Sequence, residues 1–151
     1  MSSRLAIFLA TFFYVGKCPV APGTLGTLAG LLIAVALHSW PAAYVGVMIL
    51  VTVLGFLACG PAEKALGKKD PGCIVIDEVA GIMVALFLLP LSWPVIVIGF
   101  FLFRAFDMFK IWPANRFENM GGAAGIMLDD LMAGIYTNIV LLIAIRWAMR
   151  M

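Results

Sequence analysis

The stretch GIMLDDLMAGIYTNIVLLIAIRW, residues 125–147, decides the fold of this chain, because it is apolar over a length that matches a lipid bilayer. A helix needs about 20 apolar residues to cross the hydrocarbon core, within a range of about 17 to 25. Lipid permits such a helix because its backbone polar groups are satisfied internally. The stretch therefore predicts a membrane-spanning helix that carries two adjacent carboxylates, Asp129 and Asp130, near its start.

Similar apolar segments recur along the whole chain. Of its 151 residues 64% are hydrophobic and 12% are charged, whereas soluble domains are roughly 45–50% apolar and about 25% charged. The other candidate spans are residues 24–37, 42–59, 74–89 and 94–108. Turn signals separate the candidates at Pro41, Pro61, Pro71-Gly72, Pro90 and Gly121-Gly122. We expect an all-α, polytopic membrane helix bundle with four to five transmembrane helices, forming one domain over residues 1–151.

The first apolar run, residues 5–15, is too short to span a bilayer comfortably. With Arg4 before it, the run resembles a signal peptide, but the following Gly16-Lys17-Cys18-Pro19 offers no small-x-small cleavage site. We expect the run to stay in the mature protein as a short N-terminal helix that lies in the membrane interface or re-enters the bilayer.

The distribution of Lys and Arg predicts the orientation, because basic residues concentrate in cytoplasmic loops. The basic loops contain Lys17, Lys64, Lys68, Lys69, Lys110 and Arg116. The loops around His38 and Ser92 contain no Lys or Arg. We expect the basic loops in the cytoplasm, with Arg146 and Arg150 as exceptions. The net charge of +2 is too small and too scattered to favour nucleic-acid binding.

Five of the eight acidic residues fall at the expected cytoplasmic ends of helices. They are Asp77, Glu78, Asp107, Asp129 and Asp130. Carboxylates near hydrocarbon are costly unless they are paired, hydrated or bound to a metal, so they indicate a functional site. A divalent cation such as Mg2+ resolves this cost, because it takes oxygen ligands and bridges carboxylates to phosphates. The pattern therefore predicts a cation site at the cytoplasmic membrane face.

Two of these acids each precede a glycine by one helical turn. Asp77 precedes Gly81 and Asp130 precedes Gly134, and small residues mark places where membrane helices approach closely. Thr137 and Asn138 continue the polar stripe below Asp130, as expected of a face turned into the bundle. The pattern favours convergence of the two acidic pairs.

Basic and backbone groups that can bind a phosphate occur on the same side. Arg104 lies inside an apolar helix, where it can pair with Asp107 or grip a phosphate with its planar fork. Lys110 can reach the same anion, or it is an ordinary Lys attracted to anionic lipid. Thr24 is expected as the N-cap of the first full span, and free N–H groups at a helix start attract phosphate.

Three known phosphatase chemistries are excluded. A cysteine phosphatase needs Arg six positions after its nucleophile, and none of Cys18, Cys59 and Cys73 has one. These cysteines also form no CxxC pair, so neither zinc nor disulfides are expected. A phosphohistidine mechanism needs two histidines, whereas the chain has only His38, and the D-x-D-x-T loop is missing. Carboxylates, a cation and water remain, and these suffice for phosphate hydrolysis.

Four ordered motifs carry a resemblance to a known family. The motifs are PGTLGT at 22–27, IVIDE at 74–78 with Gly81, FRAFDMFK at 103–110 with Trp112-Pro113, and GIMLDD at 125–130 with Ala133-Gly134. In them the chain resembles the phosphatidylglycerophosphatase A family of bacterial membrane enzymes. Ile111, where the family commonly has Pro, and the loose glycine motif at 122–125 depart from the family pattern without touching any acid.

The resemblance implies a reaction and a location. It implies that Mg2+ serves the hydrolysis of the terminal phosphate of phosphatidylglycerophosphate to phosphatidylglycerol, at the cytoplasmic face of the bacterial inner membrane. Position by position, it implicates as catalytic Asp77, Glu78, Asp107, Asp129 and Asp130.

Our hypothesis assigns a role to each group. Water activated by Mg2+ attacks the phosphate, while Asp107 orients Arg104 or joins the metal shell. One or two Mg2+ are held by Asp77, Glu78, Asp129 and Asp130. The substrate phosphate is bound by Arg104, Lys110 and Thr24. The choice of base or nucleophile among the carboxylates, a covalent intermediate and the oligomeric state are left open.

Two other functions compete with this hypothesis. A cation channel or transporter also uses intramembrane acids, but it would favour acids at the midplane that line a path. A transferase that moves a phosphatidyl group from a nucleotide-activated lipid is also metal-dependent and acidic, but its spaced D-G-x2-A-R motif is missing.

Overall fold

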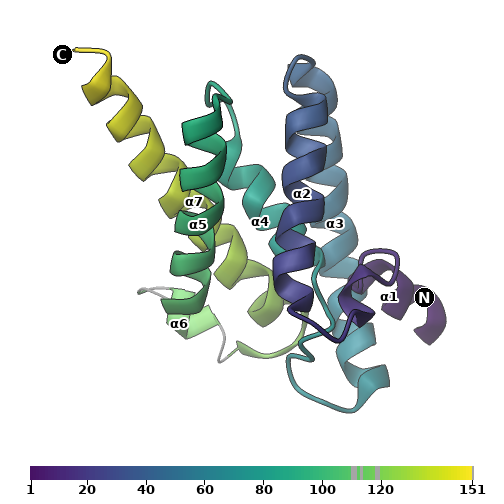
Figure 1. Cartoon of the computed structure of the whole chain (residues 1–151). Coiled ribbons are helices and arrows are strands. Elements are labelled where there is room, and N and C mark those ends of the chain that lie inside the picture. Colours follow the sequence, from purple (N-terminus) through teal and green to yellow (C-terminus); the bar gives the residue numbers. More distant parts are fainter. Residues whose placement is uncertain (110–111, 113, 118–119, 151) are drawn as a thin grey trace.

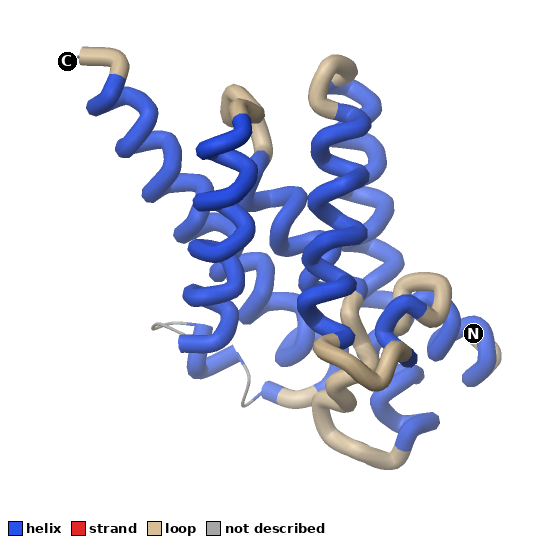
Figure 2. Tube along the Cα trace, viewed as in Figure 1, coloured by secondary structure: helices blue, strands red, loops and turns tan. Residues whose placement is uncertain are grey.

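The computed structural model describes residues 1–109, 112, 114–117 and 120–150. Within this part of the chain every regular element is a helix, which confirms the predicted all-α class (Figures 1 and 2). The elements are α1 Ser3–Ala10, the short 3-10 helix η1 Val15–Lys17, α2 Pro22–Leu37, α3 Pro41–Leu66, α4 Ile76–Leu86, α5 Trp93–Phe109, α6 Ala114–Phe117 and α7 Gly122–Ala148.

Two of these helices, α3 and α7, are long and apolar enough to cross a membrane. They have 26 and 27 residues, and a rise of 1.5 Å per residue makes each about 40 Å long against about 30 Å of hydrocarbon. The helices α2, α4 and α5 have 16, 11 and 17 residues. The number of four to five spans therefore stays a prediction.

The N-terminal run forms a helix much shorter than a bilayer. The eight residues of α1 cover about 12 Å, and the helix packs against α3. The backbone N–H of Val75 donates to the carbonyl of Ala10 at 3.0 Å, which ties the end of α1 to the segment just before α4. Its position at a membrane interface stays a prediction.

Two local predictions about helix ends are wrong. Thr24 is not the N-cap of α2: the helix begins at Pro22 after Ala21, which has a φ of 46° and makes no side-chain cap. Proline favours the first helical position, where its missing N–H costs nothing, so Thr24 lies inside the first turn. Pro61 does not end α3 either, because the helix continues to Leu66.

Packing explains why α3 passes through Pro61. Proline removes one helical hydrogen bond and crowds the preceding turn, which usually kinks or ends a helix. Here Ala58, Cys59 and Ala62 on both sides of the proline are fully buried. Tertiary contacts therefore hold the helix together where local preference alone would break it.

The shortest of the central helices, α4, is also the most enclosed. Nine of its eleven residues are buried, and it packs against α2, α3, α5 and α7. The expected segment 74–89 is longer than the helix, because the chain leaves the helix at Phe87 and turns through Leu88 with a φ of 57°. The remaining apolar residues form a turn rather than another helical turn.

The two ends of the bundle differ in chemistry. The α2–α3 and α4–α5 connections lie at the top of Figure 1, whereas α6 and the start of α7 lie at the bottom. His38 follows the last residue of α2 and so lies at the top. A cavity of about 350 Å³ between His38, Tyr44 and the α4–α5 connection belongs to that end. The helices α2, α4 and α7 begin at the opposite end, where the acidic residues lie.

Candidate metal and phosphate site

Three carboxylates from two helices converge between α4 and α7. Asp77 and Glu78 lie in the first turn of α4, and Asp130 comes from α7. One oxygen of each lies within 4.8 Å of the others. Asp77 and Asp130 are 8% and 3% exposed. We call these three residues the acidic cluster.

Each member of the acidic cluster has a buried oxygen without a hydrogen-bond partner. These atoms are Oδ1 of Asp77, Oε2 of Glu78 and Oδ2 of Asp130. A buried acceptor without a partner costs about 1–3 kcal/mol, and more when it is charged. A cation bound by the three carboxylates would offset this cost and their mutual repulsion. A donor set made only of carboxylate oxygens suits a hard divalent cation such as Mg2+, Mn2+ or Ca2+.

Two glycines bring the helices of the acidic cluster together. A Cβ atom at Gly81 would lie only 2.8 Å from the backbone oxygen of Asp130, and one at Gly134 would collide with the backbone oxygen of Gly81. Neither helix could approach the other this closely with a larger residue there. The predicted close approach of the two acid-glycine stretches is therefore confirmed.

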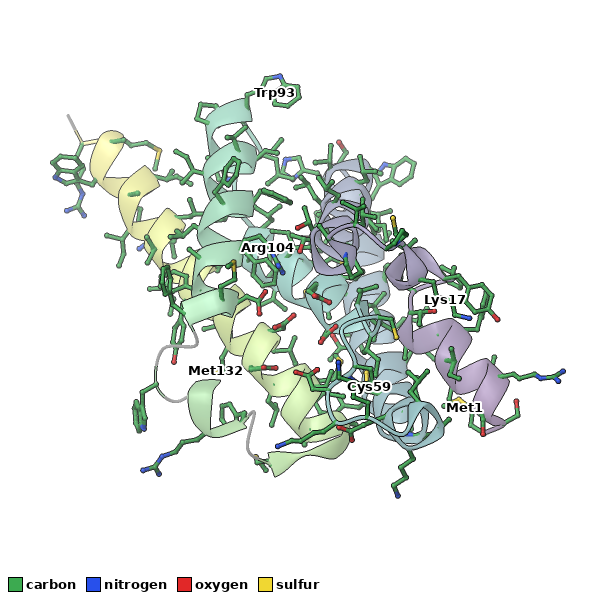
Figure 3. All side chains as sticks on the ribbon, turned by 60° about the horizontal axis from the view of Figure 1, so that its bottom comes forward. Met1, Lys17, Cys59, Trp93, Arg104 and Met132 are labelled. Atoms are coloured by element: carbon green, nitrogen blue, oxygen red, sulfur yellow. The ribbon has the colours of Figure 1, made fainter. Side chains whose placement is uncertain are left out.

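Arg104 of α5 lies beside the acidic cluster. Its Nη1 donates to Oδ2 of Asp107 at 2.5 Å and lies 3.9 Å from Oε1 of Glu78. Figure 3 shows its side chain directed into the space between the helices, where several side-chain oxygens gather. Of the two roles expected for Arg104, pairing with Asp107 is confirmed. Because a guanidinium has five donors, this pairing leaves donors for an anion.

The start of α2 closes another side of the site. A Cβ at Gly23 would collide with Oε1 of Glu78 and would lie 3.4 Å from Nη2 of Arg104. The backbone N–H groups of a first helical turn have no partners inside the helix, and they attract anions. Gly23 and Thr24 belong to this turn. A carboxylate, a guanidinium and a helix N-terminus thus meet at one point.

The chain was compared with known proteins. The model of the family described as Phosphatidylglycerophosphatase A matches residues 8–145. The chain belongs to the phosphatidylglycerophosphatase A family. The resemblance carried by the four motifs is therefore confirmed.

Relatives in this family cover most of the chain. A phosphatidylglycerophosphatase A of Escherichia coli is 38% identical over 84% of the chain and 76% of its own length. One of Haemophilus influenzae is 39% identical over 92% of the chain and 88% of its own length. A Bacteroides thetaiotaomicron protein, named provisionally as a phosphatidylinositol-3-phosphatase, is 35% identical over 96% of both chains. No solved structure has significant similarity to the chain.

The remaining predicted site residues of this family member differ in their relation to the acidic cluster. Asp107 belongs to the same site, because it accepts a hydrogen bond from Arg104, whose Nη1 also lies 3.9 Å from Oε1 of Glu78. Asp129 is buried and its Oδ1 accepts from the N–H of Asp130 at 3.1 Å, but it is not among the three converging acids. Lys110 and Ile111 lie outside the described residues.

The sequence analysis missed Glu63, whose carboxylate accepts hydrogen bonds at the start of α7 and in the loop after α3. Its Oε1 accepts from the N–H of Asp70 at 3.0 Å, and its Oε2 accepts from the N–H of Gly122 at 3.0 Å. Glu63 thereby joins the end of α3, the following loop and the first turn of α7. No periodicity in the sequence relates these positions.

The three cysteines lie in different surroundings. Cys18, Cys59 and Cys73 are all free thiols, and Cys59 is fully buried in the apolar core between α1, α3 and α4.

Proposed function

We propose that this protein hydrolyses the terminal phosphate monoester of phosphatidylglycerophosphate to phosphatidylglycerol and inorganic phosphate. The observation that carries the proposal is that the acidic cluster, which has three unpartnered carboxylate oxygens, adjoins Arg104 and the start of α2 through Oε1 of Glu78. The first group suits a cation and the others suit a phosphate, so the site can bind both at adjacent points. The substrate follows from the family and from the names of the E. coli and H. influenzae relatives.

In the proposed mechanism Asp77, Glu78 and Asp130 would hold Mg2+. When bound, the cation supplies positive charge to the phosphate and activates water. Arg104, held by Asp107, donates hydrogen bonds to the phosphate oxygens, and the first-turn N–H groups of α2 donate from the other side.

The reaction exchanges one bond to phosphorus for another. The oxygen of water bonds to phosphorus while the bond from phosphorus to the glycerol oxygen breaks. A carboxylate of the site accepts a proton from the water. The same proton then passes to the glycerol oxygen, which leaves as a hydroxyl group and returns the carboxylate to its ionised form. The residues contribute mainly by position and charge, which is the dominant contribution in phosphoryl transfer.

A second substrate class has one specific observation in its favour. The B. thetaiotaomicron relative, which matches 96% of both chains, is named for a phosphoinositide. Both substrates present a phosphate monoester on a lipid head group, so the same site could serve either. Two relatives and the family description favour the glycerol head group.

We further propose that the chain is a single multi-pass domain of the bacterial inner membrane, with the acidic cluster facing the cytoplasm. The further crossings would be α2, α5 and the apolar segment 74–89, of which α4 is the helical part. Large apolar side chains on the outer surface support this arrangement. Leu32, Leu57, Phe101 and Ile143 are each exposed by 60% or more. So much exposed apolar surface is unusual in a soluble monomer but expected beside lipid.

The function is tested by measuring phosphate release from phosphatidylglycerophosphate by purified protein, with and without Mg2+. Phosphatidylinositol 3-phosphate serves as the alternative substrate. We expect Mg2+-dependent release, a loss of more than about 100-fold in both Asp77→Asn and Asp130→Asn, and no change in Asp70→Asn, which makes the same substitution at an exposed site. Full activity in both cluster variants would refute the site, and faster release from the phosphoinositide would refute the substrate.

The topology is tested by labelling single cysteines in intact cells. With Cys18, Cys59 and Cys73 replaced by alanine, we expect Ser92→Cys to react with a membrane-impermeant maleimide. We expect Lys68→Cys to react only after the cells are opened. The reverse pattern would refute the proposed orientation.

A further inference from the structure

The helix that carries Asp77 and Glu78 ends inside the bundle. With 11 residues α4 covers about 16 Å, roughly half of a bilayer core. The last carbonyls of a helix have no partner within it. In an apolar surrounding such groups must find partners elsewhere. The C-terminal end of α4 therefore needs donors from its neighbours.

Two polar side chains supply these donors. Tyr44 of α3 donates from its hydroxyl to the carbonyl of Met83 at 2.6 Å. Asn138 of α7 points its Nδ2 at the carbonyls of Val84, Ala85 and Phe87 at 3.3, 3.1 and 2.8 Å. With three acceptors around it, this end of the amide must be the donating NH2 group.

Asn138 lies on the same face of α7 as Asp130, and we call such a row of residues four apart a stripe. Asp130, Gly134 and Asn138 follow one another at intervals of four residues, and so do Asp77, Gly81 and Ala85 on α4. Residues four apart lie on one face of a helix. The two helices begin at the same end of the bundle and run in the same direction (Figure 1).

These stripes face each other position by position. Gly81 touches the backbone of Asp130 and Gly134 touches that of Gly81. The amide of Asn138 touches the carbonyl of Ala85. The acids lie at one end of these two facing rows of residues, and Asn138 lies at the other end. A slip or rotation of α4 against α7 would break the hydrogen bonds of Asn138 and separate the acids together.

We propose that Asn138 is a positioning residue of the acidic cluster: by holding the end of α4, it fixes the register of α4 and α7 and hence the spacing of Asp77 and Glu78 from Asp130. This inference rests on the proposed function in taking these acids as cation ligands. Asn138 touches no reacting group, so it acts on cation binding through backbone geometry.

The test compares two substitutions with a matched control in the purified full-length protein. Asn138→Leu removes the amide at similar volume, and Asn138→Ser places a short hydroxyl that can bond within its own helix but cannot reach α4. Thr137→Val is the control, because the Thr137 hydroxyl donates only to Ala133 of its own helix among the hydrogen bonds of the described residues. Mn2+ binding is measured directly by electron paramagnetic resonance, and the Mg2+ dependence of phosphate release is measured beside it.

We expect both Asn138 variants to weaken Mn2+ binding by about tenfold, within the range for residues that orient metal ligands. The maximal rate at saturating Mg2+ should stay within about threefold of the wild type, and Thr137→Val should bind Mn2+ normally. Unchanged Mn2+ binding in the folded variants, or a fall in maximal rate alone, would overturn the proposal. If Asn138→Leu does not fold, Asn138→Ser decides.

The same measurements separate this inference from the proposed function. Normal Mn2+ binding and phosphate release in the wild type, together with unaltered Asn138 variants, would overturn the positioning role and leave the function standing. Absence of Mn2+ binding in the wild type would overturn the cation site itself and the positioning role with it.

Discussion

Replacing Gly81 by alanine tests whether the close approach of α4 and α7 builds the site. A Cβ at this position would lie 2.7 Å from the ring of Phe103 and 2.8 Å from the backbone oxygen of Asp130. Ordinary contacts of a Cβ begin at 3.4 Å, so α4 must move away from α7 by about 0.6 Å. The displaced atom of α7 belongs to a residue of the acidic cluster.

The expected magnitudes follow from this displacement. Overpacking costs about 1–3 kcal/mol, and the better helix propensity of alanine returns up to about 1 kcal/mol. We therefore expect the free energy of unfolding to fall by about 1–2 kcal/mol. Active sites tolerate errors of about 0.5 Å, and a misplacement of 1 Å can cost about 100-fold in rate. Phosphate release should fall by about 10- to 100-fold.

Gly46→Ala is the matched control for this variant. Gly46 lies inside α3 with nothing within 4 Å of the added Cβ, so the substitution should leave activity unchanged and stability equal or slightly higher. Both variants are compared by phosphate release and by reversible unfolding in detergent micelles. If Gly81→Ala keeps its activity within about twofold and its stability within about 0.5 kcal/mol, the argument from close approach is refuted.

Three further predictions concern side chains around the site. Arg104→Lys should lower phosphate release by about tenfold or more, because an ammonium cannot replace the planar fork; equal rates would exclude a guanidinium-specific role. Asp130→Asn should remove the rise in melting temperature that saturating Mg2+ gives the wild type. For the wild type, Mg2+ at 100 times its Kd adds about 2.7 kcal/mol to the free energy of unfolding. A retained rise in the variant would place the cation elsewhere. Glu63→Gln should lower the free energy of unfolding by about 1–2 kcal/mol, because the charge-assisted hydrogen bonds from the N–H groups of Asp70 and Gly122 weaken. The kcat for phosphate release should stay within about twofold of the wild type. A large loss of kcat at normal stability would contradict this structural role.

The sequence predicts where helices lie better than where they end. Apolar length identifies α3 and α7 because lipid solvent leaves few alternatives to a helix. Apolar length overestimates the length of the helix within the segment 74–89, since an apolar turn through Leu88 has the same composition as a further helical turn. At Pro61 the sequence underestimates the length of α3, because contacts of buried neighbours decide whether a helix continues past a proline.

The site is predictable in its residue types but not in its geometry. Asp77, Glu78 and Asp130 are predicted because carboxylates are expensive near hydrocarbon. Which of two adjacent acids, Asp129 or Asp130, faces the cluster depends on the rotation of α7, which a local pair of residues does not reveal. The contact of Gly23 with Glu78 joins segments far apart in the sequence, so no spacing rule could have found it.

The parts of the α4–α7 pair depend on one another physically. Two carboxylates on neighbouring helices share a cation only when the backbones come close, and close backbones require glycine at the crossing, as at Gly81 and Gly134. A helix that starts at the site and ends within the bundle leaves carbonyls that only a neighbouring donor can satisfy, which Asn138 provides. Carboxylate, glycine and amide therefore have to follow one another on the same face, and a substitution at any of them should change cation binding before it unfolds the chain.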